Sequence, residues 1–149
     1  MEILAENKRA FFDYEIIEKY EGGLVLMGSE VKSIKTKKMN LSGSYVIIKK
    51  NNAYLLNSEI PPYQPKNISF DYDPKRSRKI LLKKKEINSL LLKTKQKGLT
   101  LIPLKVYNKN GLIKLEFALA KGKHLFDKRE KIKKREIKRK ISGIVKNQF

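Results

Sequence analysis

Residues 99–120 read LTLIPLKVYNKNGLIKLEFALA, and this stretch decides the fold. In residues 113–117 apolar and charged side chains alternate, which is the period-two pattern of a strand with one buried face. Asn110-Gly111 separates this run from the preceding apolar run, and Asn-Gly is preferred where both residues of a tight turn need positive φ. The stretch therefore predicts an antiparallel hairpin, with a bulge or a sheet edge at Pro103.

The charge pattern of the chain changes directly after this hairpin. The formal net charge is +20, and residues 121–149 hold 12 Lys and Arg against three Asp and Glu, a share of +9. We interpret residues 1–120 as a folded body that is long enough to bury a core, and residues 121–149 as a basic tail. Because Ile137, Ile141 and Ile144 have helical spacing among repelling cations, we expect a tail that is disordered alone and becomes helical on an anionic partner.

Weaker patterns precede the hairpin. Residues 1–9 carry no periodic pattern and predict a solvated start. The alternation after Phe12 predicts a strand that ends in a flexible turn at Glu21-Gly22-Gly23, followed by a buried strand at 24–27. Ser29 is expected to cap a helix that begins next to it.

The middle of the body predicts a second hairpin and a second helix. Two apolar runs, residues 45–48 and 53–56, are separated by Lys49-Lys50-Asn51-Asn52, and Asn tolerates the conformation that such turns use. An amphipathic helix is expected from Lys84, with Gly98 at its stop. The fold class is therefore mainly β. We expect an antiparallel barrel of about six strands that resembles the oligonucleotide-binding (OB) fold, with two or three helices and the basic tail.

The composition argues against several classes of function. The chain has no cysteine and one histidine, so a thiolate or His-rich metal site is not expected, and no cofactor motif is found. Paired carboxylates, a nucleophile with a base, and the spacing of a phosphate-binding loop are also missing from the sequence, so we expect no enzyme. No apolar run is long enough to span a membrane, and we expect a cytoplasmic protein without a membrane partner.

Nucleic-acid binding is the chemistry that the sequence does supply. A strongly basic chain is typical of proteins that neutralise phosphates. The candidate phosphate contacts are Lys8, Arg9, Lys75, Arg76, Arg78, Lys79 and Lys114. Glu21 stands beside two glycines, and a carboxylate there could accept from the N–H donors of a guanine edge, although an ordinary acidic turn residue is the alternative. His124 is interpreted as a solvated or RNA-facing residue of the tail.

Several short motifs, taken together and in order, resemble the bacterial SsrA-binding protein (SmpB) family. They are Asn7-Lys8-Arg9-Ala10, Tyr20-Glu21-Gly22-Gly23, Gly28-Ser29-Glu30-Val31-Lys32-Ser33, Ser42-Gly43-Ser44-Tyr45, the run from Asp73 to Leu82, the run from Lys97 to Tyr107, Ala120-Lys121-Gly122-Lys123 and Asp127-Lys128-Arg129. One departure is Phe11-Phe12, which stands where the family commonly has Arg-His. A phosphate contact and a polar contact expected there are therefore in question.

The resemblance implies an OB-fold barrel that binds the tRNA-like domain of transfer-messenger RNA (tmRNA) in trans-translation, the rescue of stalled ribosomes. It implies RNA-binding roles for Asn7, Glu21, Leu81 and Lys114. It also implies that the tail enters the decoding centre and the empty mRNA channel as a helix. The tail positions concerned are Gly122, His124, Phe126, Asp127, Lys128 and Arg129.

The partners implied by the resemblance are tmRNA, the ribosome and, functionally, alanyl-tRNA synthetase and elongation factor Tu. Two other hypotheses remain open from the residues alone. One is a general RNA-binding or ribosomal barrel whose tail threads ribosomal RNA. The other is an enzyme such as a nuclease, for which the sequence offers the least support.

Overall fold

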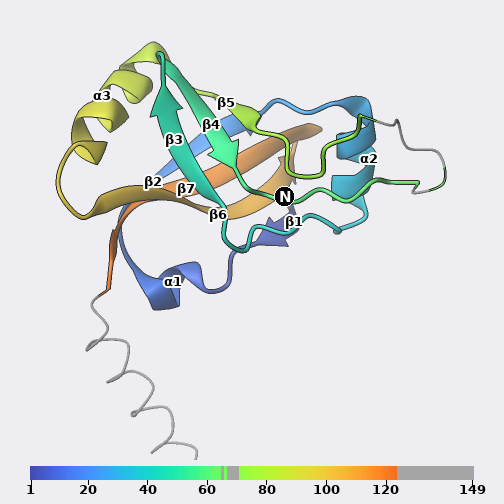
Figure 1. The fold of residues 1–149 in the computed structure, drawn as a ribbon, viewed down its shortest axis with the longest axis horizontal. Helices are drawn as coiled ribbons and strands as arrows, with labels where there is room; N and C mark the ends of the chain where they lie inside the picture. Colours follow the sequence, from blue (N-terminus) through green and yellow to red (C-terminus); the bar gives the residue numbers. More distant parts are fainter. Residues whose placement is uncertain (65, 67–70, 124–149) are drawn as a thin grey trace, which may run out of the picture.

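The computed structural model describes residues 1–64, 66 and 71–123. Seven strands and three helices follow one another along this part of the chain (Figure 1). They are β1 (Glu2–Glu6), α1 (Ala10–Asp13), β2 (Tyr14–Leu24), α2 (Gly28–Lys35), β3 (Tyr45–Lys49), β4 (Asn52–Leu56), β5 (Arg78–Leu81), α3 (Lys84–Thr94), β6 (Leu99–Lys109) and β7 (Leu112–Gly122).

The predicted hairpin at residues 99–120 is confirmed as β6 and β7. The two strands pair antiparallel from Leu99 opposite Lys121 to Lys109 opposite Leu112. Asn110 and Gly111 form the turn with φ of 53° and 81°, as the Asn-Gly pair requires. The register shifts between Pro103 and Lys105, so the bulge expected at the proline is also confirmed.

The strand pairings close on themselves. Around the ring, the strand order is β6, β3, β4, β5, β2 and β7. β7 then pairs with β6, which closes the ring, and every pairing is antiparallel. The seventh strand, β1, adds to β6 beyond the point where β6 pairs with β3. This antiparallel ring with three helices confirms the predicted mainly β, OB-fold-like architecture, with one strand more than the expected number of about six.

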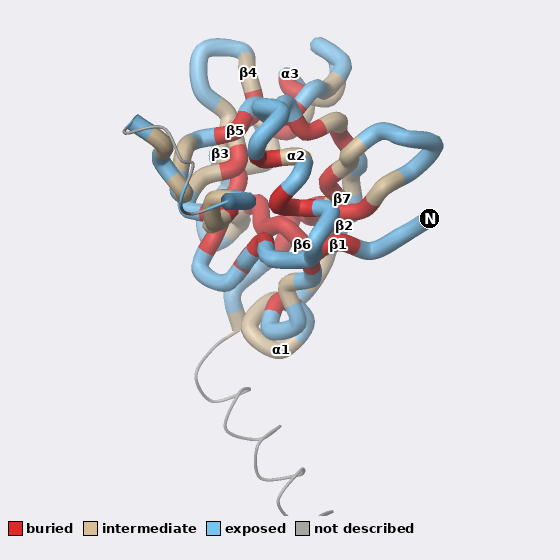
Figure 2. Tube along the Cα trace, turned by 90° about the vertical axis from the view of Figure 1, so that its right-hand side faces the viewer, coloured by how far each residue is buried: buried red, intermediate tan, exposed pale blue. Residues whose placement is uncertain are grey.

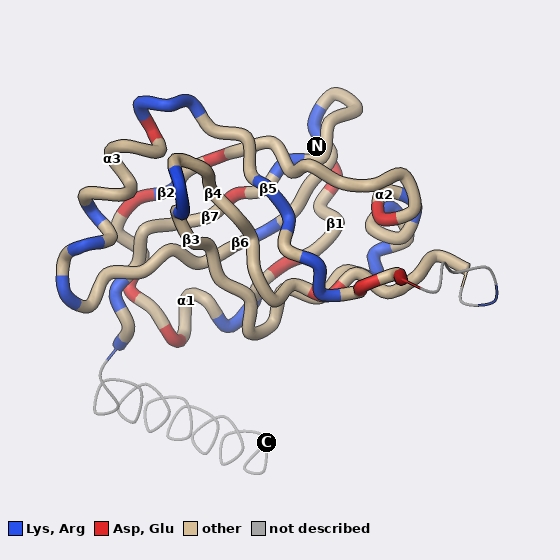
Figure 3. Tube along the Cα trace, turned by 45° about the horizontal axis from the view of Figure 1, so that its top comes forward, with Lys and Arg blue, Asp and Glu red and all other residues tan. Residues whose placement is uncertain are grey.

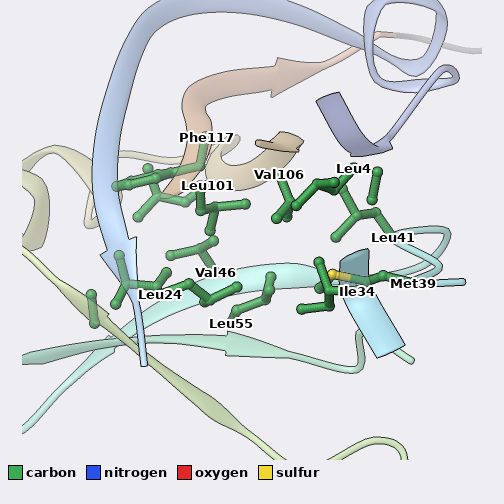
Figure 4. Close-up of a cluster of buried hydrophobic side chains, with 14 of the residues drawn as sticks. Leu4, Leu24, Ile34, Met39, Leu41, Val46, Leu55, Leu101, Val106 and Phe117 are labelled. Carbon is green, nitrogen blue, oxygen red and sulfur yellow. The ribbon is translucent and has the colours of Figure 1, made fainter. Parts of the chain in front are cut away.

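Two apolar clusters lie on the two faces of the β6–β7 hairpin. The larger fills the ring, and Figure 4 shows members of it, among them Val46, Leu55 and Leu101. The smaller lies outside the ring, where Ala10 of α1 packs with Ile102, Leu104, Ala118 and Ala120. In Figure 2 the buried positions accordingly form the centre of the molecule, with exposed loops around it. Both faces of the hairpin are therefore covered near α1.

The structure corrects five expectations for the first 30 residues. Residues 2–6 form β1 instead of a solvated start, and α1 occupies residues 10–13, where a strand was predicted to begin. β2 runs straight through Gly22-Gly23 to Leu24, so these glycines are not a turn and residues 25–27 are not a strand. Met27, not Ser29, precedes α2, and the Glu30 carboxylate accepts from its backbone N–H at 2.8 Å.

The later elements follow the predictions closely. The hairpin expected within residues 45–56 is β3 and β4, and the amphipathic helix expected from Lys84 is α3. On α3, Lys93 donates to the Glu18 carboxylate at 2.7 Å and to the Tyr20 hydroxyl at 3.1 Å, which holds the helix against β2. None of the helices in the described part of the chain is long and apolar enough to cross a membrane.

Candidate RNA interface

Sheet register places two of the predicted site residues, Leu81 and Lys114, on either side of Gly23. Gly23 on β2 is paired with Leu81 of β5 on one side and with Lys114 of β7 on the other. Directly paired residues project to the same face of a sheet, so Leu81 and Lys114 flank Gly23 on the outside of the ring. Leu81 is 57% exposed, which is unusual for a leucine in a strand. This row forms the centre of the candidate interface.

Glu21 lies on the same face, two residues before Gly23. Its carboxylate accepts a short hydrogen bond from the Tyr107 hydroxyl and a bond of 3.3 Å from Lys114 Nζ, and Lys109 Nζ lies 3.6 Å away. The Tyr107 hydroxyl, together with Lys114 and Lys109, holds the pKa of Glu21 below its ordinary value. Burial and the adjacent carboxylate raise the pKa of the Tyr107 hydroxyl. At neutral pH the site therefore presents a fixed carboxylate beside a phenol that remains a proton donor.

The two glycines beside Glu21 have different roles. A Cβ on Gly22 would lie 2.5 Å from Ile80 Cγ2 and 3.0 Å from the Leu81 carbonyl oxygen, so the close approach of β5 requires glycine there. A Cβ on Gly23 would make ordinary contacts with Leu81 at 3.6 Å. Folding thus requires glycine only at the first position. The absent side chain at the second leaves the backbone between Leu81 and Lys114 open to a ligand.

Further cations extend this face along β7. Glu116 pairs with Lys105 Nζ at 3.5 Å and with Lys19 Nζ at 3.8 Å, and Lys105 Nζ lies 5.8 Å from the centre of the Tyr107 ring. Figure 3 shows Lys and Arg positions distributed over the strands and loops, with fewer acidic positions among them. The interface is therefore a positively charged face in which two acids are held in place by lysines.

Asn7 stands away from this row, at the end of β1. Its side-chain amide donates to the Pro103 carbonyl at 3.0 Å, and its backbone N–H donates to the Leu104 carbonyl at 2.8 Å. Lys8 and Arg9 are exposed just before α1, where Arg9 lies near Asp13 and above the Phe12 ring. This side of the molecule carries a pocket of about 340 Å³ lined by Asn7, Arg9 and residues of α1 and β6.

Arg78 contradicts the prediction of a phosphate contact. Its side chain is completely buried, and Nε and Nη2 donate to Glu30 Oε2 at 2.9 and 2.6 Å. Nη1 donates to the Ser58 carbonyl at 2.8 Å, and Nη2 also reaches the Pro74 carbonyl at 3.1 Å. Because all of its donors point into the protein, Arg78 is part of the core.

Arg76 belongs largely to the same network. Its Nη2 donates to Glu30 Oε1 at 2.5 Å, with about a third of the side chain exposed. Burial acts to raise the pKa of Glu30, but the hydrogen bonds from Arg76, the Met27 N–H and Arg78 outweigh it and hold this pKa below its ordinary value. The basic loop thus contributes a buried ion network, which leaves Lys75 and Lys79 exposed at the surface.

The remaining predicted positions concern the tail. Gly122 is the last residue of β7, opposite Tyr14, and is exposed. The backbone N–H of Lys123 donates to the Asp13 carbonyl at 3.0 Å, so the chain leaves the body beside α1. The other tail positions, His124, Phe126, Asp127, Lys128 and Arg129, lie outside the described residues. The expectations about order in the tail concern residues 124–149, which are outside the described part of the chain as well.

Sequence reasoning missed four members of this face. Tyr107 and Lys109 hold Glu21, and Lys19 and Lys105 hold Glu116. Tyr107 and Lys109 sit in the predicted hairpin at the alternate positions that share a face with Lys114, so the hairpin register contained the signal for them. The local sequence pattern does not show that β2 pairs with β7, and this pairing is what brings Lys19 next to Glu116.

Comparison with protein-family models matches residues 4–147 to the family described as SmpB protein. The chain belongs to the SmpB family. It is 51% identical to the SsrA-binding protein of Sulfurihydrogenibium sp. (strain YO3AOP1) over 99% of this chain and 96% of that protein. It is 49% identical to the SsrA-binding protein of Trichodesmium erythraeum (strain IMS101) over 97% of this chain and 92% of that protein.

A solved structure is similar as well. It is described as "tmRNA-SmpB: a journey to the center of the bacterial ribosome", and one of its chains matches with a TM-score of 0.67 and 46% sequence identity, covering 80% of this chain and 84% of that chain. The SmpB-like fold of the described residues thus agrees with the family assignment. Within residues 1–64, 66 and 71–123, no group of three or more His, Cys, Asp or Glu side chains could hold a metal ion.

Proposed function

We propose that this protein binds the tRNA-like domain of tmRNA and delivers that RNA to stalled ribosomes in trans-translation. The observation that carries the proposal is the convergence of Glu21, Leu81 and Lys114 on one exposed face of a protein of the SmpB family. The relatives are named for SsrA binding, and the similar structure is described as tmRNA-SmpB on the ribosome.

The chemistry of this face suits a folded RNA that exposes unpaired bases. A carboxylate held by Tyr107 and Lys114 can accept two N–H donors of a guanine edge without reorganising. The apolar, exposed Leu81 can lie against a base or a ribose, and Lys109 and Lys114 can meet the phosphates that follow. Gly23 between them allows the RNA backbone to approach. This combination specifies a base, which lysines alone would not do.

Residues 121–149 complete the proposal as a second functional unit. We propose that this basic tail becomes helical in the decoding centre and the empty mRNA channel, with Gly122, His124, Phe126, Asp127, Lys128 and Arg129 at functional positions. The protein then acts in the cytoplasm as an adaptor without catalytic activity. Alanyl-tRNA synthetase and elongation factor Tu would act on the same RNA complex.

Sequencing of RNA that copurifies with the full-length protein from cells tests the binding proposal. We expect tmRNA to be enriched far above ribosomal RNA and tRNA. An unselective mixture in proportion to cellular abundance would instead support a general RNA-binding barrel. Incubation of labelled RNA with the pure protein, with and without magnesium, tests the absence of nuclease activity, for which we expect intact RNA.

Removal of the tail tests its separate role. The cut belongs after Lys123, because β7 ends at Gly122 and Lys123 still bonds to Asp13. We expect the shortened protein to bind the tRNA-like domain but to fail in a rescue assay with ribosomes stalled on a message without a stop codon. Equal loss of affinity for every RNA would contradict a dedicated ribosomal role for the tail.

A further inference from the structure

Two carboxylates lie directly opposite each other on the candidate RNA interface. Glu21 of β2 is paired in register with Glu116 of β7. Directly paired residues project to the same face of a sheet, with their Cβ atoms about 5 Å apart, and like charges in such a pair destabilise the sheet. Both acids would also repel a phosphate backbone. A face that bound only phosphates would be stronger without them, so their position requires another explanation.

Glu21 engages two lysines through one of its oxygens. Lys114 Nζ lies 3.3 Å and Lys109 Nζ lies 3.6 Å from Oε1, whereas the Tyr107 hydroxyl donates a short bond to Oε2. The two lysine distances are longer than a good hydrogen bond between charged groups, which measures about 2.7–2.9 Å. The side chain of Lys109 is also half exposed. The phenol therefore fixes the carboxylate, while the two lysines are held loosely.

Glu116 engages two more lysines. Lys105 Nζ lies 3.5 Å from Oε2, and Lys19 Nζ, on a side chain that is more than half exposed, lies 3.8 Å from Oε1. Within the described part of the chain no hydroxyl donates to this carboxylate, so Glu116 has no equivalent of Tyr107. Exposed ion pairs are weak, and each changes an equilibrium by a factor of about five at most. Phosphates can therefore displace either carboxylate from its lysines.

We propose that Glu21 and Glu116 make this face selective by keeping its lysines engaged when the RNA lacks the cognate base. A ligand that offers only phosphates takes lysines away from the carboxylates and leaves two like charges opposed. A guanine edge compensates for this loss at Glu21, because its N–H donors replace the lysines on Oε1 while the lysines move to phosphates. Glu21 thus weakens non-cognate binding and strengthens cognate binding, whereas Glu116 does only the former.

Selectivity of this kind rests on the proposed function, because it requires RNA on the Glu21 face. It adds a role that base reading alone does not include, since the two acids lower the affinity for most other RNA. A chain with a net charge of +20 would otherwise bind many polyanions. The cognate RNA can recruit the four lysines of this face, and other RNAs reach them only by breaking ion pairs.

Fluorescence anisotropy with a labelled 12-nucleotide oligo(U), which contains no guanine, tests the proposal in the full chain. Each lysine that becomes available to a phosphate should steepen the slope of log K against log salt by about 0.7. Glu21→Gln and Glu116→Gln should therefore each bind oligo(U) with a slope that is steeper by about 0.7–1.4. At 0.15 M salt this corresponds to roughly 4- to 14-fold tighter binding.

Glu15→Gln is the matched control. Glu15 is an exposed acid on β2 that forms no ion pair within the described residues, so its replacement adds the same charge but releases no lysine. The slope of this variant should equal that of the parent. Adding Lys109→Gln and Lys114→Gln to Glu21→Gln should return the slope to the parental value, which assigns the change to these two lysines.

Two different RNAs separate the selectivity from the proposed function. The affinity of Glu21→Gln for the tRNA-like domain reports base reading, whereas its affinity for oligo(U) reports the release of lysines. An oligo(U) slope no steeper than that of Glu15→Gln, in either acid variant, would overturn the role proposed for that acid, whatever the result with the tRNA-like domain. A lower Tm with an unchanged slope would likewise assign the ion pairs to stability alone. A circular dichroism spectrum like that of the parent confirms that each variant is folded.

Discussion

Replacing Glu30 by Gln should destabilise the protein more than loss of any surface ion pair. The carboxylate is completely buried and accepts four hydrogen bonds, two on each oxygen, from Met27, Arg76 and Arg78. Gln retains one acceptor oxygen and turns an amide group, itself a donor, toward guanidinium donors. Arg78 then remains buried without a counter-charge.

The size of the effect follows from the burial. Removing one partner of a buried ion pair costs about 3–5 kcal/mol of unfolding free energy. For a folded domain of roughly 120 residues, each kcal/mol lowers Tm by about 4 °C, so the expected decrease is about 12–20 °C. Glu116→Gln is the matched control, because Glu116 pairs with the half-exposed Lys19 and with Lys105; this loss should cost no more than about 1 kcal/mol.

The pH dependence supplies a second readout of the same group. The pKa of Glu30 in the folded protein lies below the ordinary 4.5. Its contribution to stability is therefore complete above about pH 4.5 and is lost as the pH falls through the folded pKa. The difference in stability between the parent and Glu30→Gln should shrink as the pH falls below 4.5.

Thermal and urea unfolding followed by circular dichroism measure both effects. A decrease in Tm of less than about 4 °C for Glu30→Gln, or one equal to that of Glu116→Gln, would refute the role of the buried network. If the difference in unfolding free energy between the parent and Glu30→Gln stays constant from pH 7 to pH 3, the ionised Glu30 carboxylate is not the source of that stability.

Four further substitutions test individual contacts by urea unfolding. Gly22→Ala should cost about 1–3 kcal/mol because its Cβ would collide with Ile80, whereas Gly23→Ala should change stability by less than about 1 kcal/mol; equal effects would contradict the different packing of the two glycines. Gly111→Ala forces an L residue to a φ of 81° and should cost roughly 1–2 kcal/mol, and an unchanged midpoint would argue against the Asn-Gly turn. Asn7→Ala removes the bond to the Pro103 carbonyl and should cost about 1 kcal/mol, so a neutral result would mean that β1 is not held there.

The sequence predicted the elements whose signals are local. The alternation of residues 113–117 and the Asn-Gly pair were sufficient for the β6–β7 hairpin, and the helical spacing after Lys84 was sufficient for α3. The sequence does not predict β1 because a bulge between Ile3 and Ala5 buries both Leu4 and Ala5, which are neighbours in sequence, and this breaks the period of two. Glycine is usual in turns, so Gly22-Gly23 predicts a turn, whereas in the structure the close approach of β5 requires glycine at Gly22, inside a continuous strand.

The site was predictable in its residue types but not in its partners. A run of basic residues does not reveal that Arg78 is neutralised by Glu30, which stands 48 residues earlier. Likewise Tyr107, the residue that fixes the Glu21 carboxylate, lies 86 residues away. Such contacts depend on which strands become neighbours, and no local pattern contains that information.

Affinity of the Glu21→Gln variant for the tRNA-like domain of tmRNA is the most direct test of base reading on this face. Glu116→Gln makes the same charge change two strand positions from Lys114 and serves as the control. At one fixed salt concentration, we expect Glu21→Gln to bind about 5- to 150-fold more weakly despite its added positive charge, and Glu116→Gln to bind equally or more tightly. Equal or tighter binding by Glu21→Gln would contradict a role for this carboxylate in recognising the RNA.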